Sequence, residues 1–412
     1  MPMASLTIPH RVHFGSLILA ASLSLTACGD GGGSGGGGPE PTARRFAVTV
    51  TAAPDFSSGA TSVIAAEPPR TARNELVPTV SDLAVACHGR YFFRIERFQA
   101  DNVTKFDVDA PDRVLWQATT QDPTDTVSSN PGALAFVDDT KAYLLRYGSK
   151  KAWIVNPSAT DPTGFKTGDL DLSAYDEGDG VPEMQAAVVV GDRLFVVLQR
   201  LNFFVPSETA YVAVFDVATD TEIDTGRGAD GLKGIPLEVR NPMTLRYDPA
   251  TGLLYVAAPG RFAFGGAPAE YTGGIETIDP VTFETRLVVD DGTDDDHPLG
   301  QILDAVVVDA QTGYLIGSAG YQDNTLYRFD PASGAVVSNA SGPRAVLGLA
   351  GLNLTHLAVA PDGRVWIGNG DPTAPGMMVL APAPDPDDDA LEEALIGTSL
   401  NPLQTCFAEV AG

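Results

Sequence analysis

Short apolar runs separated by turn residues recur along most of this 412-residue chain. Each unit begins with an apolar run, continues through a turn, and then has a second apolar run with an aromatic residue near its start. Six such pairs of runs begin near residues 81, 131, 182, 241, 301 and 354. A repeat of roughly 50–60 residues is typical of architectures built from one supersecondary unit used many times. The repeat therefore has to be interpreted before any single element.

The turns and the later runs of each unit indicate antiparallel strands. The turn at 248–252 reads DPATG and the turn at 361–363 reads PDG, and Gly and Asp accept the positive φ that a tight reversal requires. A third run follows, for example at 212–219, and then a more polar fourth run, for example at 285–290 and 335–338. Only residues 387–395 could form a turn or two of helix. Four antiparallel strands per unit, repeated radially, predict an all-β fold of the propeller type.

The two ends of the repeat region complete one another. Residues 46–51, 60–65 and 75–78 fit the second, third and fourth strands of a blade without a first strand, and residues 401–408 fit a first strand with no blade after it. We therefore predict a seven-bladed propeller over residues 45–412 whose last blade is shared by both ends. A six-bladed ring is the alternative. Ring closure would remove exposed strand edges, which promote aggregation.

Two of the three cysteines fall next to this closure. Cys406 lies in the predicted innermost strand of the composite blade, and Cys87 ends the innermost strand of its neighbour. An oxidising compartment permits a disulfide between them. In the simple chain-entropy account, closing so long a loop stabilises the fold by about 4–5 kcal/mol. Two unpaired buried thiols are the alternative.

The N-terminal segment predicts export. Residues 14–25 are apolar and follow a short basic stretch, which is the arrangement of a secretory signal. The signal ends in LTAC and in this resembles a bacterial lipoprotein signal. That resemblance implies removal of residues 1–27 and lipidation of Cys28, so that the protein meets the membrane through a lipid anchor. An ordinary signal with a chance cysteine is the alternative.

Residues 28–44 begin with this cysteine and are rich in glycine. Such a composition is typical of a flexible tether. Gly29, rather than aspartate, follows the cysteine, and in the lipoproteins that this segment resembles that residue implies sorting to the outer membrane. We therefore expect an exported protein anchored to the bacterial cell envelope.

The charge of the chain restricts its partners. The formal net charge is −27 at pH 7, and 44% of the residues are hydrophobic. The hydrophobic fraction is enough for a folded core, whereas the negative field repels nucleic acid and anionic headgroups and attracts cations. We expect no nucleic-acid partner.

Three segments resemble the bacterial seven-bladed propellers of the YVTN-repeat type. They are FDVATDTEI at 215–223, LRYDPATGLLYVA at 245–257 and LAVAPDGRVWI at 357–367. The resemblance implies a propeller that binds a protein, a glycan or a small ligand in the envelope. A structural spacer in a surface layer is a further alternative.

Motifs for catalysis are not found in the sequence. His88, His297 and His356 occur in different units without metal-ligand spacing, and neither a GxSxG elbow nor a phosphate-binding glycine loop is present. The sequence therefore points to no catalytic residue and no required cofactor.

Polar residues lie near the predicted start of each innermost strand, and these starts share one face of a propeller, which we call the mouth face. Oxygen ligands of this kind suit Ca²⁺, so a calcium-dependent hydrolase or lactonase is the alternative function, with Glu183, Asn241 and Asp304 as metal ligands. Asx residues that cap turns are the simpler explanation. The other predicted residues of the channel mouth are Asp82, Asn130, His356 and Asn401.

Arginine and aromatic residues follow several second strands and would also lie on the mouth face. Arginine beside exposed aromatic residues is typical of a binding surface, although aromatic residues in these loops could pack between blades instead. The candidates for this surface are Arg97, Arg146, Arg200, Arg261 and Tyr321, with Phe98, Tyr147, Phe203, Phe204 and Phe262 beside them.

Overall fold

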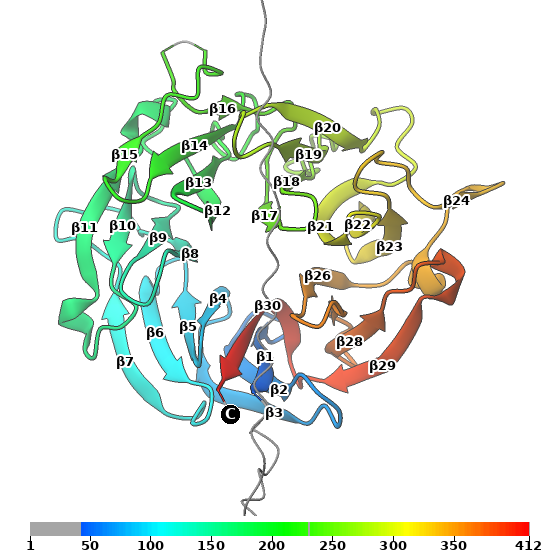
Figure 1. Cartoon of the computed structure of the whole chain (residues 1–412), viewed down its shortest axis with the longest axis horizontal. Helices are drawn as coiled ribbons and strands as arrows, with labels where there is room; N and C mark the ends of the chain where they lie inside the picture. Colours follow the sequence, from blue (N-terminus) through cyan, green and yellow to red (C-terminus); the bar gives the residue numbers. More distant parts are fainter. Residues whose placement is uncertain (1–42, 230, 412) are drawn as a thin grey trace, which may run out of the picture. The chain divides into compact units, whose positions relative to one another are not determined.

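The computed structural model describes residues 43–229 and 231–411, and these residues form a seven-bladed β-propeller (Figure 1). The predicted fold class is confirmed. The predicted signal, Cys28 and nearly all of the tether lie outside the described residues. We number the six blades made of consecutive strands 1 to 6 in chain order, and keep the name composite blade for the seventh.

The strands of each blade are given from the innermost outward, beginning with the composite blade and blades 1 to 3. The composite blade contains β30 (Asn401–Val410), β1 (Arg44–Ala52), β2 (Gly59–Ala65) and β3 (Ala72–Thr79). Blade 1 contains β4 (Leu83–His88), β5 (Tyr91–Glu96), β6 (Asn102–Asp107) and β7 (Val114–Thr119). Blade 2 contains β8 (Pro131–Phe136), β9 (Ala142–Arg146), β10 (Lys151–Val155) and β11 (Lys166–Asp171). Blade 3 contains β12 (Met184–Val190), β13 (Arg193–Leu198), β14 (Tyr211–Asp216), β15 (Thr221–Glu222) and β16 (Ile235–Pro236).

Blades 4 to 6 complete the ring. Blade 4 contains β17 (Thr244–Asp248), β18 (Leu253–Ala258), β19 (Gly274–Ile278) and β20 (Thr285–Asp290). Blade 5 contains β21 (Gln301–Asp309), β22 (Thr312–Gly320) and β23 (Asp323–Phe329), followed by a hairpin of β24 (Ser338–Asn339) and β25 (Gly342–Pro343). Blade 6 contains β26 (Leu354–Val359), β27 (Val365–Asn369), β28 (Gly376–Ala381) and β29 (Ala390–Gly397).

The hydrophobic core lies between neighbouring blades. The second and third strands of each blade are covered on both faces, which explains their continuous apolar runs. In β13, for example, every residue from Leu194 to Leu198 is fully buried. Its Leu194, Val196 and Leu198 pack in one cluster with Tyr143 and Leu145 of blade 2. The outer fourth strands alternate instead, because only one of their faces meets the protein.

Two local predictions are wrong. Residues 387–395 form a 3-10 turn, η4 (Pro386–Asp388), and then strand β29, in which Leu391 pairs with Leu380 of β28. The good helix formers in this segment are overruled by pairing with the sheet. The fourth strand expected at 335–338 is reduced in blade 5 to a single bridge between Val336 and Phe329.

Helical structure in the described residues consists of four 3-10 turns. Besides η4 these are η1 (Pro162–Gly164), η2 (Ser173–Tyr175) and η3 (Val346–Gly348). No helix among these residues is both long and apolar enough to cross a membrane.

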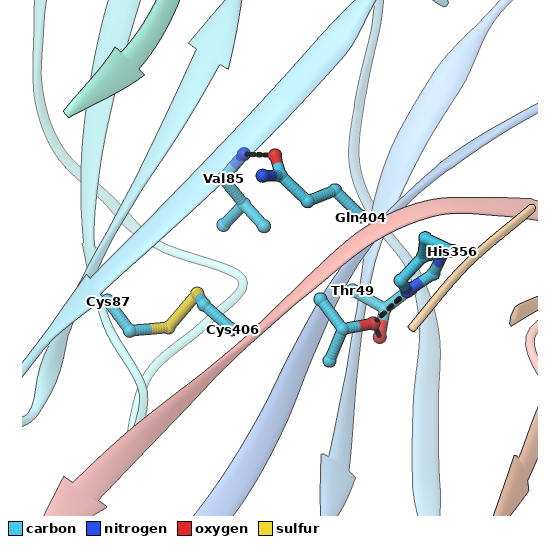
Figure 2. Close-up of a disulfide and its surroundings, with 7 residues drawn as sticks. Thr49, Val85, Cys87, His356, Gln404 and Cys406 are labelled. Carbon is cyan, nitrogen blue, oxygen red and sulfur yellow. Dashed lines mark hydrogen bonds between the residues drawn. A yellow bond between two sulfur atoms is a disulfide. The ribbon is translucent and has the colours of Figure 1, made fainter. Parts of the chain in front are cut away.

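The composite blade closes the ring as predicted. Strand β1 pairs with β2 on one side and with β30 on the other, and Val48 lies opposite Cys406 in that register. Cys406 forms the predicted disulfide with Cys87 of β4, across a Cα–Cα distance of 5.6 Å (Figure 2). The side chain of Gln404 accepts a hydrogen bond of 2.9 Å from the Val85 amide. Covalent and polar links therefore fasten the last strand to blade 1.

Loss of this disulfide is expected to destabilise the ring. The double variant Cys87→Ala/Cys406→Ala should lose about 2–5 kcal/mol of free energy of unfolding, because the unfolded chain gains freedom when the link between its ends is removed. Urea unfolding measures this change. The native protein in reductant is the control and should match the variant. Equal midpoints for the variant and the oxidised protein would contradict the role assigned to the disulfide.

Candidate binding site at the mouth of the channel

The innermost strands surround a central channel of about 380 Å³. Polar side chains in this channel mostly link neighbouring blades. The guanidinium of Arg246 on β17 forms an ion pair with Asp304 on β21, and donates to the Ala305 carbonyl at 2.7 Å and the Leu357 carbonyl at 3.2 Å. Asp304 in turn accepts a bond of 2.8 Å from the Leu357 amide. This network joins blades 4, 5 and 6, and Arg246 was not among the sequence candidates.

His356 is also part of the wall of the channel. Its Nε2 atom lies 2.8 Å from the hydroxyl of Thr405 on β30, which in turn lies 2.8 Å from the hydroxyl of Thr49 (Figure 2). Burial lowers the pKa of His356 to about 4, so the ring is neutral at physiological pH. The contact joins blade 6 to the composite blade and gives this histidine a structural role.

The three predicted metal ligands have separate partners. Asp304 is engaged by Arg246, Glu183 accepts a bond of 2.9 Å from the Leu201 amide, and Asn241 accepts one of 2.8 Å from Gln199. Among the residues that the structure describes, no group of three or more His, Cys, Asp or Glu side chains is arranged to hold a metal ion. Each of the three side chains thus has a partner within the protein, and no bound ion is needed to explain its position. The calcium site stays a prediction.

Backbone geometry explains several polar residues at the mouth. Asn130, Glu183 and Asn241 have φ values of 45°, 47° and 57° just before their innermost strands. Asparagine adopts this left-handed region more readily than most residues. Asp82 lies at the same level and pairs with Arg97 at 3.4 Å. The left-handed backbone therefore accounts for the two asparagines, although neither caps its turn: the Asn130 side-chain oxygen has no partner, and that of Asn241 accepts from Gln199.

The predicted arginines divide into two groups. Arg146 is fully buried, where Asp122 and Asp125 pair with its guanidinium, so its assignment to the binding surface is wrong. Arg200 is also largely covered, paired with Glu177 and lying over the ring of Tyr211. The list of accessible candidates is therefore reduced to Arg97 and Arg261. The two buried side chains stabilise the connections between blades.

Tyr147 does not belong to an exposed surface either, because it is half-buried and its hydroxyl donates to the Gln199 side chain at 2.9 Å. The other predicted aromatic residues are exposed and lie on one face. Phe56, Phe98, Phe203, Phe204, Phe262, Phe264 and Tyr321 all occur in loops between second and third strands. In an antiparallel blade these loops lie at the same end as the start of the innermost strand, which places them on the mouth face. Tyr321, Phe264 and Phe204 are 85%, 83% and 81% exposed. We call these seven residues the aromatic crown.

A second cavity, of about 560 Å³, lies beside the crown and shares Leu303, Thr355 and Leu403 with the channel wall. We call it the mouth pocket. Its rim includes Phe56, Phe262 and Tyr321 of the crown, and its polar lining is made of amide and hydroxyl groups from the composite blade and blades 5 and 6. Sequence reasoning found Asn401 and Tyr321 but missed the other amides, which are Gln301, Gln322, Asn324 and Asn353.

Comparison with known proteins supports the fold alone. The sequence matches no protein family and no curated protein at a significant level. Two solved structures, from Bacteroides uniformis and Bacteroides fragilis, are each described as a "putative 6-phosphogluconolactonase". Each aligns with a TM-score of 0.55 and 12% identity over 88% of this chain. The alignments include 99% of the B. uniformis chain and 98% of the B. fragilis chain. AztD from Citrobacter koseri aligns with a TM-score of 0.47 and 15% identity over 90% of this chain and 99% of its own. The chain is thus similar in architecture to other propellers.

Buried carboxyl groups at the mouth predict a pH dependence of stability. Burial raises the pKa of Glu183 from 4.5 to about 8, and that of Asp291 from 3.8 to about 7. The folded protein then holds protons that the unfolded chain releases, so their contribution to stability is complete below the ordinary pKa and is lost as pH rises through the folded value. For Glu183 that window runs from about pH 4.5 to 8.

The variant Glu183→Gln is expected to reduce this loss. In native protein the free energy of unfolding should fall by up to about 1.4 kcal/mol per pH unit through Glu183 alone. Urea unfolding between pH 5 and 8 measures the slope, and the variant should be flatter. Replacement of the exposed Glu67 by Gln is the control and should leave the slope unchanged. Identical slopes for Glu183→Gln and native protein would refute the assignment.

Proposed function

We propose that this propeller is a binding module of the bacterial cell envelope that takes a protein, a glycan or a small ligand at its mouth face. The aromatic crown carries this proposal. Seven large aromatic side chains on one face are costly to expose to water unless they contact a partner. On the opposite face lie the loops between third and fourth strands. Among the described residues of these loops, Val281 is the large apolar side chain that is exposed. Aromatic anchors of this kind supply much of the free energy of recognition.

A lipid anchor at Cys28 is part of the same proposal. The segment before Cys28 has the composition of a secretory signal, and the Gly-rich residues after it would hold the propeller away from the headgroups. A lipoprotein carries several acyl chains, which bind a membrane firmly. Gly29 supports a location in the outer membrane.

The alternative function is a calcium-dependent hydrolase or lactonase that uses the channel mouth. Similarity in fold to the two Bacteroides proteins does not extend to a reaction, because identity is only 12%. The side chains that would bind the ion are engaged in contacts between and within blades. The spacer alternative, in turn, gives no reason for the exposed crown. Binding is therefore the function that the geometry favours.

The crown is expected to carry the binding of a partner. The double variant Phe203→Ser/Phe204→Ser should bind at least about tenfold more weakly, with an unchanged melting temperature because both side chains are exposed. Surface-immobilised full-length protein would be exposed separately to the protein, glycan and small-molecule fractions of a bacterial envelope. Val281→Ser, on the opposite face, is the matched control. An equal loss of affinity in Phe203→Ser/Phe204→Ser and in Val281→Ser, or unchanged affinity in both, would count against a binding role for the crown.

Replacement of Cys28 tests the anchor. In a two-membrane host, native protein should sediment with the outer membrane, whereas Cys28→Ser should remain soluble because no lipid can be attached. Gly29→Asp is the matched control, since it preserves the acceptor cysteine and should shift the protein to the inner membrane. Metabolic labelling with palmitate measures lipid attachment, and subsequent fractionation of the cells measures the location of each variant. Membrane association of Cys28→Ser equal to that of native protein would disprove the anchor.

A further inference from the structure

The mouth pocket has a lining without charge, in a protein whose net charge is −27. Its side chains are aromatic, aliphatic, amide and hydroxyl groups, drawn from the composite blade and blades 4, 5 and 6. A charged ligand would lose its hydration here without gaining a counterion, which is unfavourable. The pocket volume of about 560 Å³ is within the usual range for small-molecule sites. The lining therefore selects for a neutral ligand.

The amides in this pocket are oriented so that their oxygens remain available. The side-chain nitrogen of Asn324 donates to the Leu354 carbonyl at 2.7 Å, that of Asn353 to the Gly370 carbonyl at 2.6 Å, and that of Gln301 to the Pro259 carbonyl at 2.7 Å. These bonds fix which end of each amide is the nitrogen. In each of these three amides the nitrogen is held by a main-chain carbonyl, so the oxygen is the end that no such bond anchors.

Two of these acceptors are buried and have no partner in the described structure. They are the Oδ1 atoms of Asn324, whose residue is 5% exposed, and of Asn401. A buried acceptor without a hydrogen bond is unfavourable, and native proteins pair nearly all such groups. Both residues line the mouth pocket, Asn324 from blade 5 and Asn401 from the composite blade. A ligand that pairs with either oxygen must bring hydrogen-bond donors.

We propose that the mouth pocket binds a neutral saccharide. Sugar hydroxyls donate to the oxygens of Asn324 and Asn401, and the apolar face of the sugar ring lies against Tyr321, Phe262 or Phe56 at the rim. A peptide fits less well, because its carbonyl groups cannot pair with the oxygens of Asn324 and Asn401. This inference deepens the proposed binding function and rests on it.

Calorimetric titration of the full-length protein with sugars tests the proposal. The probes are glucose, galactose, mannose, N-acetylglucosamine and their neutral disaccharides, each compared with a charged counterpart such as glucuronate or glucosamine. At least one neutral sugar should bind, and its charged counterpart should bind at least about tenfold more weakly. Absence of binding by every neutral sugar at concentrations on the order of 10 mM, or equal binding of the charged counterparts, would overturn the proposal.

Variants locate the binding to the pocket. Tyr321→Ala removes an exposed ring and Asn324→Leu removes a buried acceptor, and each should weaken the sugar by at least about tenfold. Phe264→Ala is the matched control, because Phe264 is as exposed as Tyr321 but does not line the pocket. If Asn324→Leu does not fold, the aromatic variants Tyr321→Ala and Phe262→Ala decide. Unchanged affinity in Tyr321→Ala together with Phe262→Ala would overturn the assignment.

The two proposals fail separately. If no neutral sugar binds while Phe203→Ser/Phe204→Ser still loses a protein or small-molecule partner, the saccharide inference is wrong and the binding function stands. If native protein binds neither a sugar nor a component of any envelope fraction, both are wrong.

Discussion

The pairing of the last strand with the first holds the ring together. Strand β30 fills the innermost place of a blade whose other three strands come from the opposite end of the described chain. Without it, β1 would expose an unpaired edge to the channel, and β4 and β26 would lose the strand that both of them contact. The disulfide from Cys406 to Cys87 fastens β30 to blade 1, and the Thr405 hydroxyl near His356 fastens it to blade 6. The mouth pocket depends on the same closure, because Asn401 and Leu403 of β30 form part of its lining.

Local sequence rules were sufficient for the architecture. Apolar runs and Gly-containing turns mark each strand pair, and the two incomplete ends could be matched because each contained what the other lacked. The disulfide followed from that match, since it depends on which strands become neighbours. Residues 390–397 resisted this reasoning for a physical reason: Leu, Glu and Ala favour a helix locally, and only the adjacent β28 makes a strand the better state. Pairing partners of that kind are not visible in a single segment.

Side-chain roles at the mouth were less predictable. Arg97 and Arg146 both lie at or just after second strands, yet Arg146 is buried because Asp122 and Asp125 return to it from the connection to the blade. From the sequence, Asp304 was a candidate metal ligand. In the structure, Arg246 of the neighbouring blade forms an ion pair with it, so Asp304 already has a counter-charge. The orientation of the Asn324 amide, which leaves its oxygen without a partner, is set by a hydrogen bond to the Leu354 carbonyl, 30 residues away in sequence. Such roles depend on distances between blades, which a strand pattern does not contain.

The distribution of charge connects the exterior with the site. An excess of carboxylates favours solubility and repels anionic headgroups and nucleic acid, which would suit the membrane-tethered module that we propose. The same field would bias a charged pocket toward cations whatever their shape. The mouth pocket avoids this bias because its lining is neutral, and a neutral ligand has no net Coulomb interaction with the field. Selection there must rest on the positions of acceptors such as Asn324 and on the faces of aromatic rings such as Tyr321. The anionic surface and the uncharged pocket therefore do not conflict, because the surface charge affects solubility and the pocket lining affects ligand selection.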